Sequence, residues 1–282
     1  MQATETLIDI GDTKLNTRQL GEGFPLVILH GGPGLDHHVF GDYLDPLAER
    51  YQLVFVDQRG QGRSEKAPPE TLTIDQMAAD VSALAGALDL GEYAVLGHSY
   101  GAFVALQHAV SHPGEAAKSI ISSGVPAASY LAVVEKNLEA FEPVELREQV
   151  TNSWAKETDV QTPEAVHQLL AEQMPFHFKD PFDPRMEEFD RRTVGARYSP
   201  EVLRHFAVQE YGGIDVEDKL SAVPQPVLVL AGRHDRACSL EASEAMHAGL
   251  PDSQLVVFDE SAHMTLVEEN EKYLEAVSEF LG

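Results

Sequence analysis

The segment GHSYG at 97–101 sets a serine between two glycines, one two residues before it and one two residues after it. It follows the short apolar run Tyr93–Gly97 and leads into a helix-like pattern over Ser99–Val110. A serine at a sharp strand-to-helix turn has a strained backbone and an exposed hydroxyl, and larger neighbours would crowd that turn. A glycine-rich junction without function can carry the same letters. The strand and helix around the motif favour Ser99 as a nucleophile.

A serine nucleophile needs a base that removes its proton and a third group that orients the base. Asp235 follows the apolar run Val227–Ala231, and His263 follows the run Leu255–Phe258. Side chains at the carboxyl ends of parallel strands gather at one edge of a sheet. We therefore predict His263 as the base and Asp235 as its partner, with Asp259 as the second candidate for the acid.

Acyl transfer also needs two backbone N–H groups that converge on the developing oxyanion. One is expected from Tyr100, the residue after the serine. The other is expected from the segment HGGPG at 30–34, where glycines allow the backbone to approach the substrate closely. We predict Gly32 as this second donor, with Gly31 as the alternative.

These residues follow short apolar runs that alternate with amphipathic helical patterns. Such alternation predicts an α/β fold with a mostly parallel sheet. A polar hairpin is expected over Thr6–Leu20. The predicted buried strands are Leu26–His30, Leu53–Asp57, Tyr93–Gly97, Lys118–Ser122, Val227–Ala231 and Leu255–Phe258. The predicted helices around them are Asp75–Leu88, Ser99–Val110, Leu240–Leu250 and Glu268–Leu281.

Strand patterns are absent from the middle of the sequence. Helix-like acidic segments take their place over Leu131–Phe141, Val144–Thr151 and Pro163–Met174. We expect a core formed by residues 1–125 and 223–282, with residues 126–222 inserted as a helical cap. The cap aromatics are expected to pack mainly on one another, and Trp154 is a candidate contact for the substrate.

The 282 residues contain 20 Lys+Arg and 46 Asp+Glu, which gives a net charge of −26. A field of this sign repels phosphate backbones and anionic membranes, so nucleic acid and membrane partners are not expected. A single cysteine excludes an internal disulfide and a multi-cysteine zinc site. The proposed chemistry requires no metal or organic cofactor. We expect a cytoplasmic protein with a small-molecule or short-peptide substrate, and the sequence leaves its oligomeric state open.

The motifs HGGPG, DQRGQGRS at 57–64, GHSYGA, GRHD and DESAH fall in an order that resembles the α/β-hydrolase superfamily. More narrowly, HGGPG together with DQRGQGRS resembles the proline iminopeptidase group. The resemblance implies an α/β-hydrolase fold with a helical cap, a triad of Ser99, Asp235 and His263, and oxyanion donors at Gly32 and Tyr100. It also implies release of N-terminal residues, often proline, from short peptides or amides.

Two positions depart from that group. Tyr100 stands where a tryptophan is frequent, and Arg236 stands where an acid often follows the catalytic aspartate. Members of the group bind the substrate amine through cap glutamates. Glu210, Glu201 and Glu172 are the candidates here, and Gly31 and Trp154 are further candidate substrate contacts.

Two other functions fit the same motifs. A carboxylesterase or lactonase would use the same triad with an apolar pocket, and a non-catalytic receptor of this fold could retain the triad. Dehalogenases and epoxide hydrolases of this fold carry an aspartate at the nucleophile position, so Ser99 argues against them.

Overall fold

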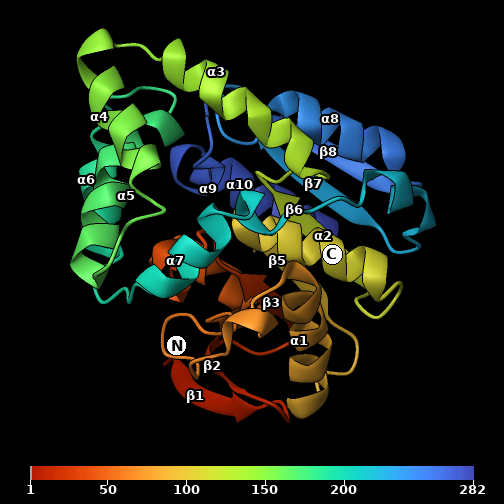
Figure 1. Cartoon of the computed structure of the whole chain (residues 1–282). Coiled ribbons are helices and arrows are strands. Elements are labelled where there is room, and N and C mark those ends of the chain that lie inside the picture. The colour runs from red at the N-terminus through yellow and green to blue at the C-terminus, as the bar shows by residue number, and fades with distance from the viewer. Residues whose placement is uncertain (1) are drawn as a thin grey trace.

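A computed structural model describes residues 2–282 and contains one eight-stranded sheet (Figure 1). The strand order is β1-β2-β4-β3-β5-β6-β7-β8; β2 runs antiparallel to both of its neighbours, and the other pairs are parallel. The strands are β1 (Thr4–Asp9), β2 (Lys14–Leu20), β3 (Phe24–Leu29), β4 (Tyr51–Val56), β5 (Ala94–His98), β6 (Lys118–Ser122), β7 (Val227–Gly232) and β8 (Ser253–Phe258). The predicted α/β class and the N-terminal hairpin are confirmed.

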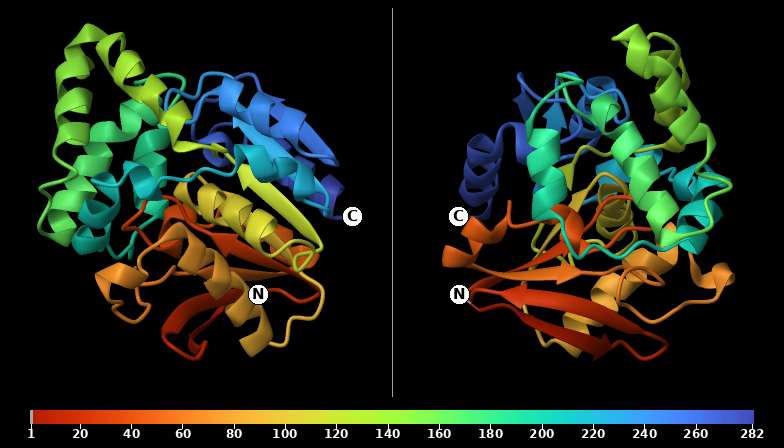
Figure 2. Two further views of the ribbon diagram at one scale, coloured as in Figure 1. Left: turned by 45° about the vertical axis from the view of Figure 1, so that its right-hand side comes forward. Right: turned by 90° about the vertical axis from the view of Figure 1, so that its left-hand side faces the viewer.

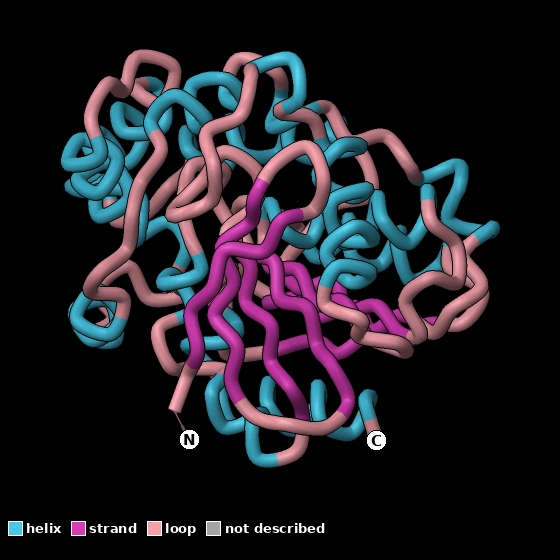
Figure 3. Tube along the Cα trace, turned by 90° about the horizontal axis from the view of Figure 1, so that it is seen from below, coloured by secondary structure: helices cyan, strands magenta, loops and turns pink. Residues whose placement is uncertain are grey.

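Alternate residues of the central strands build two hydrophobic cores, one on each face of the sheet. Val27 and Val95 point into the core beneath α1 (Ile74–Ala87), α2 (Tyr100–Ser111) and α8 (Leu240–Gly249). Leu26 and Leu96 point into the opposite core, which α10 (Asn270–Leu281) covers. Seen from below in Figure 3, the strands run side by side with helices on both sides. Burial on both faces explains why these strands read as continuous apolar runs.

The last predicted helix is interrupted. Residues Thr265–Glu268 form the short helix α9, and Glu269 leaves the helical conformation at φ −129° and ψ 54° before α10 begins.

The predicted cap of the first helix is also present: Thr73 accepts a hydrogen bond from the Gln76 N–H of α1 at 3.1 Å. Among residues 2–282, the helices are all too short or too polar to cross a bilayer.

Five helices lie between β6 and β7 and gather on one side of the molecule (green and teal in Figures 1 and 2). They are α3 (Val133–Glu139), α4 (Val144–Ala155), α5 (Pro163–His177), α6 (Arg185–Arg192) and α7 (Pro200–Ala207). The sequence patterns identified the first three and missed α6 and α7. The last turn of this segment, at Glu217–Ala222, packs Leu220 against α8, so the boundaries of the 126–222 insertion stay a prediction.

The turn between β5 and α2 is too crowded for side chains at its two glycines. A Cβ on Gly97 would lie 2.0 Å from the carbonyl oxygen of Gly101, and a Cβ on Gly101 would lie 2.2 Å from the carbonyl oxygen of Leu29 in β3. Ser99 sits between them with φ +56°, a conformation that costs a non-glycine residue about 1–3 kcal/mol. The packing of β3, β5 and α2 therefore forces the serine outward.

This crowding makes Gly97 sensitive to one added methyl group. Gly97→Ala should lower the free energy of unfolding by about 3 kcal/mol or more, because backbone atoms would have to move. Gly86→Ala in α1 is the matched control, since a Cβ there meets nothing within 4 Å. It should raise the stability by up to about 1 kcal/mol. Urea unfolding measures both changes, and a wild-type midpoint for Gly97→Ala would contradict the packing argument.

Candidate active site

The three predicted triad residues meet at the carboxyl edge of the sheet. His263 Nε2 lies 2.9 Å from Ser99 Oγ, and His263 Nδ1 lies 2.8 Å from Asp235 Oδ2. A carboxylate only accepts hydrogen bonds, so Nδ1 carries the proton and Nε2 is left to accept from the serine hydroxyl. The other carboxylate oxygen accepts from the N–H groups of Ala237 and Cys238 at 2.8 and 2.9 Å. These bonds fix the orientation of the buried Asp235 side chain.

The loops that carry the acid and the base pack directly against each other. A Cβ on Gly232, at the end of β7, would lie 1.8 Å from the carbonyl oxygen of Ala262. Backbone bonds from Arg233 to Phe258 and from His234 to Ser261 join the same two loops. Because β7 and β8 are parallel neighbours, their following loops leave the sheet side by side. This contact brings Asp235 and His263 within hydrogen-bonding distance.

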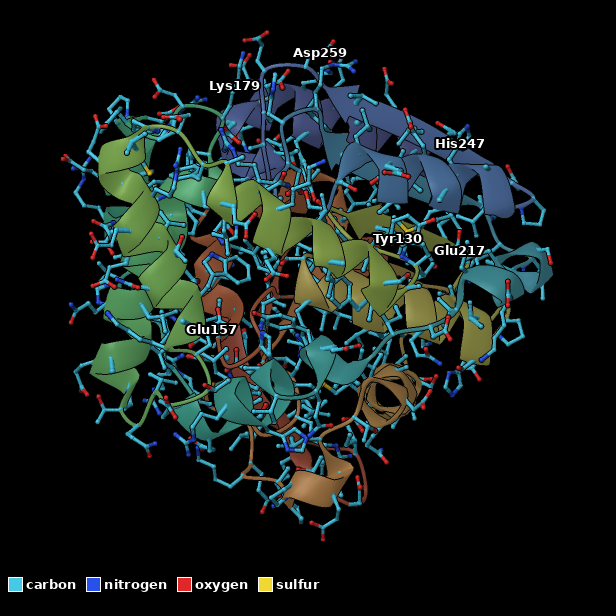
Figure 4. All side chains as sticks on the ribbon, turned by 45° about the horizontal axis from the view of Figure 1, so that its top comes forward. Tyr130, Glu157, Lys179, Glu217, His247 and Asp259 are labelled. Carbon is cyan, nitrogen blue, oxygen red and sulfur yellow. The ribbon has the colours of Figure 1, made fainter. Side chains whose placement is uncertain are left out.

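Asp259, the second candidate for the acid, lies outside the site. Its side chain is 62% exposed and pairs with Arg233 at 2.6 Å. Figure 4 shows it at the rim of the molecule. Asp259 directly follows Phe258, and its carboxylate points outward to Arg233 rather than toward His263.

The predicted oxyanion loop lies against the serine. A Cβ on Gly31 would lie 3.2 Å from Ser99 Cβ and 3.7 Å from Ser99 Oγ. Within residues 2–282, the N–H groups of Gly32 and Tyr100 donate no hydrogen bond. The Tyr100 side chain turns away into the core, where its ring contacts Phe206, so only its backbone can serve the site.

The loop after β4 holds the oxyanion loop in place. Gln58 Nε2 donates to the carbonyl oxygen of His30 at 2.8 Å, and the N–H of Gly34 donates to Gln61 Oε1 at 2.6 Å. Asp57 accepts from the backbone N–H and the ring of His37. Burial alone would raise the pKa of Asp57, but these bonds outweigh it and hold the pKa well below its usual range.

Arg59 anchors this loop in turn. Its guanidinium bonds to Asp80 of α1 and to Asp12, not to the nearby Asp57. The motif at 57–64 forms the loop after β4, and its hydrogen bonds join α1 to the oxyanion loop.

Two further histidines surround the base. The rings of His98 and His177 lie 5.3 and 4.9 Å from that of His263. Burial, together with repulsion from His263, lowers the pKa of both well below the usual histidine value. The imidazole of His263 is thus flanked by two uncharged histidine rings. His177 was missed from the sequence because nothing distinguishes it within a helical cap segment.

The cap is bonded to the catalytic loops near His177. The backbone oxygen of His177 accepts from the N–H of His263 at 2.9 Å. Arg236 donates to the backbone oxygens of Phe176, Phe178 and Lys179 at 2.7–3.2 Å. Arg236, which stands where related enzymes often have an acid, therefore ties the cap to the acid loop.

A cavity of about 720 Å³ opens over Ser99 between the core and the cap. Its wall includes Gly31, Gly32, Tyr100 and Trp154, as the sequence analysis expected. Glu210, Glu201 and Glu172 do not line it, so the structure places these three candidates outside the cavity. Glu210 is exposed, whereas Glu201 and Glu172 form ion pairs with Lys66 and Lys156. Periodicity in the cap could not show which face of each helix turns inward.

The buried acid among the carboxylates that line the cavity is Glu157, in the turn after α4 (Figure 4). It is 6% exposed, and its oxygens accept from Gln173 Nε2 at 2.7 Å and from the Tyr211 hydroxyl. Burial raises the pKa of this carboxyl, and the two bonds offset part of that rise. No cationic side chain of residues 2–282 pairs with it. The cavity therefore contains a buried acid without a counter-ion.

Tyr211 reaches Glu157 because of an unusual backbone. Its φ of +53° and ψ of 37° lie in the left-handed region, which is rare for an aromatic residue. This conformation turns the tyrosine toward the cavity and leaves the preceding Glu210 facing solvent. A sequence pattern that assumes regular helix or strand cannot predict such a turn.

Two groups of side chains could offer metal-ligating atoms. They are Asp235, Cys238 and His263, and Asp36, His37 and His38. In the first group the carboxylate and imidazole bond to each other, and burial raises the pKa of the Cys238 thiol well above its usual value. In the second group Asp36 bonds to Arg63, and His37 bonds to Asp57. Both groups are better explained by these internal bonds.

Comparison with known proteins agrees with this geometry. The family profile described as alpha/beta hydrolase fold matches residues 25–270. The proline iminopeptidase of Clostridium botulinum is 31% identical over all of this chain and 99% of its own length. An alpha/beta fold hydrolase from Bacillus anthracis has a TM-score of 0.83 at 24% identity, with 99% of both chains covered. An esterase from Exiguobacterium antarcticum has a TM-score of 0.75 at 26% identity, with 98% of this chain and 99% of the esterase covered. The chain therefore belongs to the alpha/beta hydrolase family and is a hydrolase of the proline iminopeptidase type.

Proposed function

We propose that this chain is an aminopeptidase that hydrolyses the amide bond after the N-terminal residue of short peptides or amides. Ser99 is the nucleophile, His263 the general base and Asp235 the group that orients the base. The observation that carries this proposal is the continuous hydrogen-bond chain from Asp235 through His263 to Ser99, at the floor of a cavity that also holds a buried carboxylate.

The reaction has two steps. Ser99 Oγ attacks the carbonyl carbon while its proton moves to His263 Nε2, and the N–H groups of Gly32 and Tyr100 stabilise the oxyanion. His263 then gives that proton to the leaving amine as the C–N bond breaks, and water hydrolyses the acyl-serine by the same route. Each oxyanion donor is worth about 3–4 kcal/mol of barrier reduction.

Glu157 is the proposed recognition group for the substrate amine. A buried carboxylate without a counter-ion is costly, and a substrate ammonium would supply the missing charge. The relatives named proline iminopeptidase make a free N-terminal amine the expected cation. The pKa of Glu157 is raised by burial, so the KM for aminoacyl substrates should rise as the pH falls and this carboxylate takes up a proton.

A carboxylesterase is the second candidate. The cavity is lined mostly by aliphatic, methionine and aromatic side chains, and an esterase is among the similar structures. The same triad would cleave an acyl ester, but an ester without an amine has no use for Glu157. The two functions therefore differ in their dependence on this one acid.

Removal of the nucleophile is the first prediction here. Ser99→Ala should abolish labelling by a fluorophosphonate probe and lower kcat by at least about 10⁴-fold, because no other group supplies the attacking oxygen. Ser111→Ala, at the C-terminal end of α2, should be labelled by the probe and should turn over substrate like wild type. Undiminished labelling of the Ser99→Ala protein would show that the assignment is wrong.

The second prediction concerns substitution of the buried acid Glu157. Glu157→Gln should lower kcat/KM for a prolyl or alanyl anilide by about 30-fold or more, since removing one partner of a buried charge pair costs about 2–5 kcal/mol. Hydrolysis of a short-chain nitrophenyl ester by the same variant should change less than about threefold. Glu210→Gln, which alters an exposed acid outside the cavity, is the matched control. Ester turnover without any anilide turnover by the wild type would favour the carboxylesterase.

A further inference from the structure

Helix α5 forms one long wall of the cavity. Its lining residues extend from His167 to His177, which corresponds to about 15 Å along the helix axis. His177 contacts the ring of His263 and marks the catalytic end. His167 is 52% exposed and marks the end that opens to solvent. At about 3.5 Å per extended residue, this wall has the length of roughly four residues of peptide.

The two edges of this wall differ in chemistry. Gln173 and His177 are four residues apart, so they lie on one edge of the helix, whereas Met174 lies about 100° further round. Gln173 bonds to Glu157, and Trp154 packs beside His177 with ring centroids 5.9 Å apart. We call the part of the cavity lined by Trp154, Glu157, Gln173 and Tyr211 the polar lobe.

The other edge faces an apolar part of the cavity. Leu170 packs in one cluster with Leu35, Val39 and Leu203, and Met174 packs in the cluster that also contacts Val39. We call the part of the cavity lined by Leu35, Val39, Leu170, Met174 and Leu203 the apolar lobe. Leu35 directly follows the oxyanion loop, so this lobe begins beside Ser99.

Both lobes line the cavity that holds Ser99, so the two sides of a scissile bond at the serine can occupy different lobes. If the proposed function holds, the amine and its residue occupy the polar lobe at Glu157. We propose that the apolar lobe binds the leaving side of the peptide, and that the preferred substrates are short peptides with apolar residues at the second and third positions. Burial of such side chains against Leu170, Met174 and Leu203 favours them over polar ones.

The open end of the cavity adds a second constraint. Glu187, Asp190 and Arg191 line it and are exposed, and Asp190 pairs with His167, so a peptide that emerges there meets charged groups of both signs. Amidated test peptides carry no C-terminal charge, and differences among them therefore report on the apolar lobe.

The test compares three substrates with the same N-terminal residue: prolinamide, Pro-Leu-Leu-amide and Pro-Ser-Ser-amide. Prolinamide releases ammonia and leaves the apolar lobe empty. The kcat/KM for the leucine peptide should exceed that for the serine peptide by tenfold or more. Met174→Gln should reduce this ratio at least threefold. Gln168→Ala, exposed on the same helix and outside the cavity, should change neither.

The outcomes separate the two proposals. Equal turnover of the two tripeptides by an enzyme that cleaves prolinamide would overturn the assignment of the apolar lobe and leave the aminopeptidase function intact. A Met174→Gln variant that lowers the turnover of all three substrates by the same factor would likewise overturn the assignment of the apolar lobe and leave the aminopeptidase function intact. Failure to cleave any of the three, with retained ester hydrolysis, would overturn the aminopeptidase function and the lobe assignment together.

Discussion

The hydrogen bond between His263 and Asp235 is the interaction on which the rest of the site depends. It joins two loops that are far apart in sequence and adjacent in space because β7 and β8 are parallel neighbours. The glycine at 232 allows these loops to touch, and the bonds from Ala237 and Cys238 fix the carboxylate. With the acid fixed, the imidazole has one orientation, and its free nitrogen faces the serine on β5.

The charges around this interaction are divided between two regions of the cavity. Near the base, two buried histidines remain uncharged, so they contribute no positive charge beside the imidazolium that forms during reaction. Beside α5, the buried carboxylate of Glu157 accepts hydrogen bonds from Gln173 and Tyr211, and it has no cationic partner within residues 2–282. A low-dielectric cavity strengthens both effects. The catalytic end is thus suited to proton transfer and the Glu157 region to recognition of a positive group.

The core and the convergence of the three candidate triad residues were predictable because both follow from local patterns. Apolar runs doubly buried in a parallel sheet are unmistakable, and reactive side chains at strand ends must converge at one edge. The cap was less predictable. Glu157 and Glu210 both lie in acidic segments, and only the left-handed turn at Tyr211 and the packing of α4 on α5 decide which of them faces inward. Such choices depend on tertiary contacts that no periodicity records.

The bonds that Arg236 and His263 make to the chain at 176–179 have a consequence for motion. That corner of the cap cannot lift away without pulling on the loops of the acid and the base. Movement that admits a ligand must therefore leave this corner in place, because its bonds couple the position of the cap to the alignment of the triad.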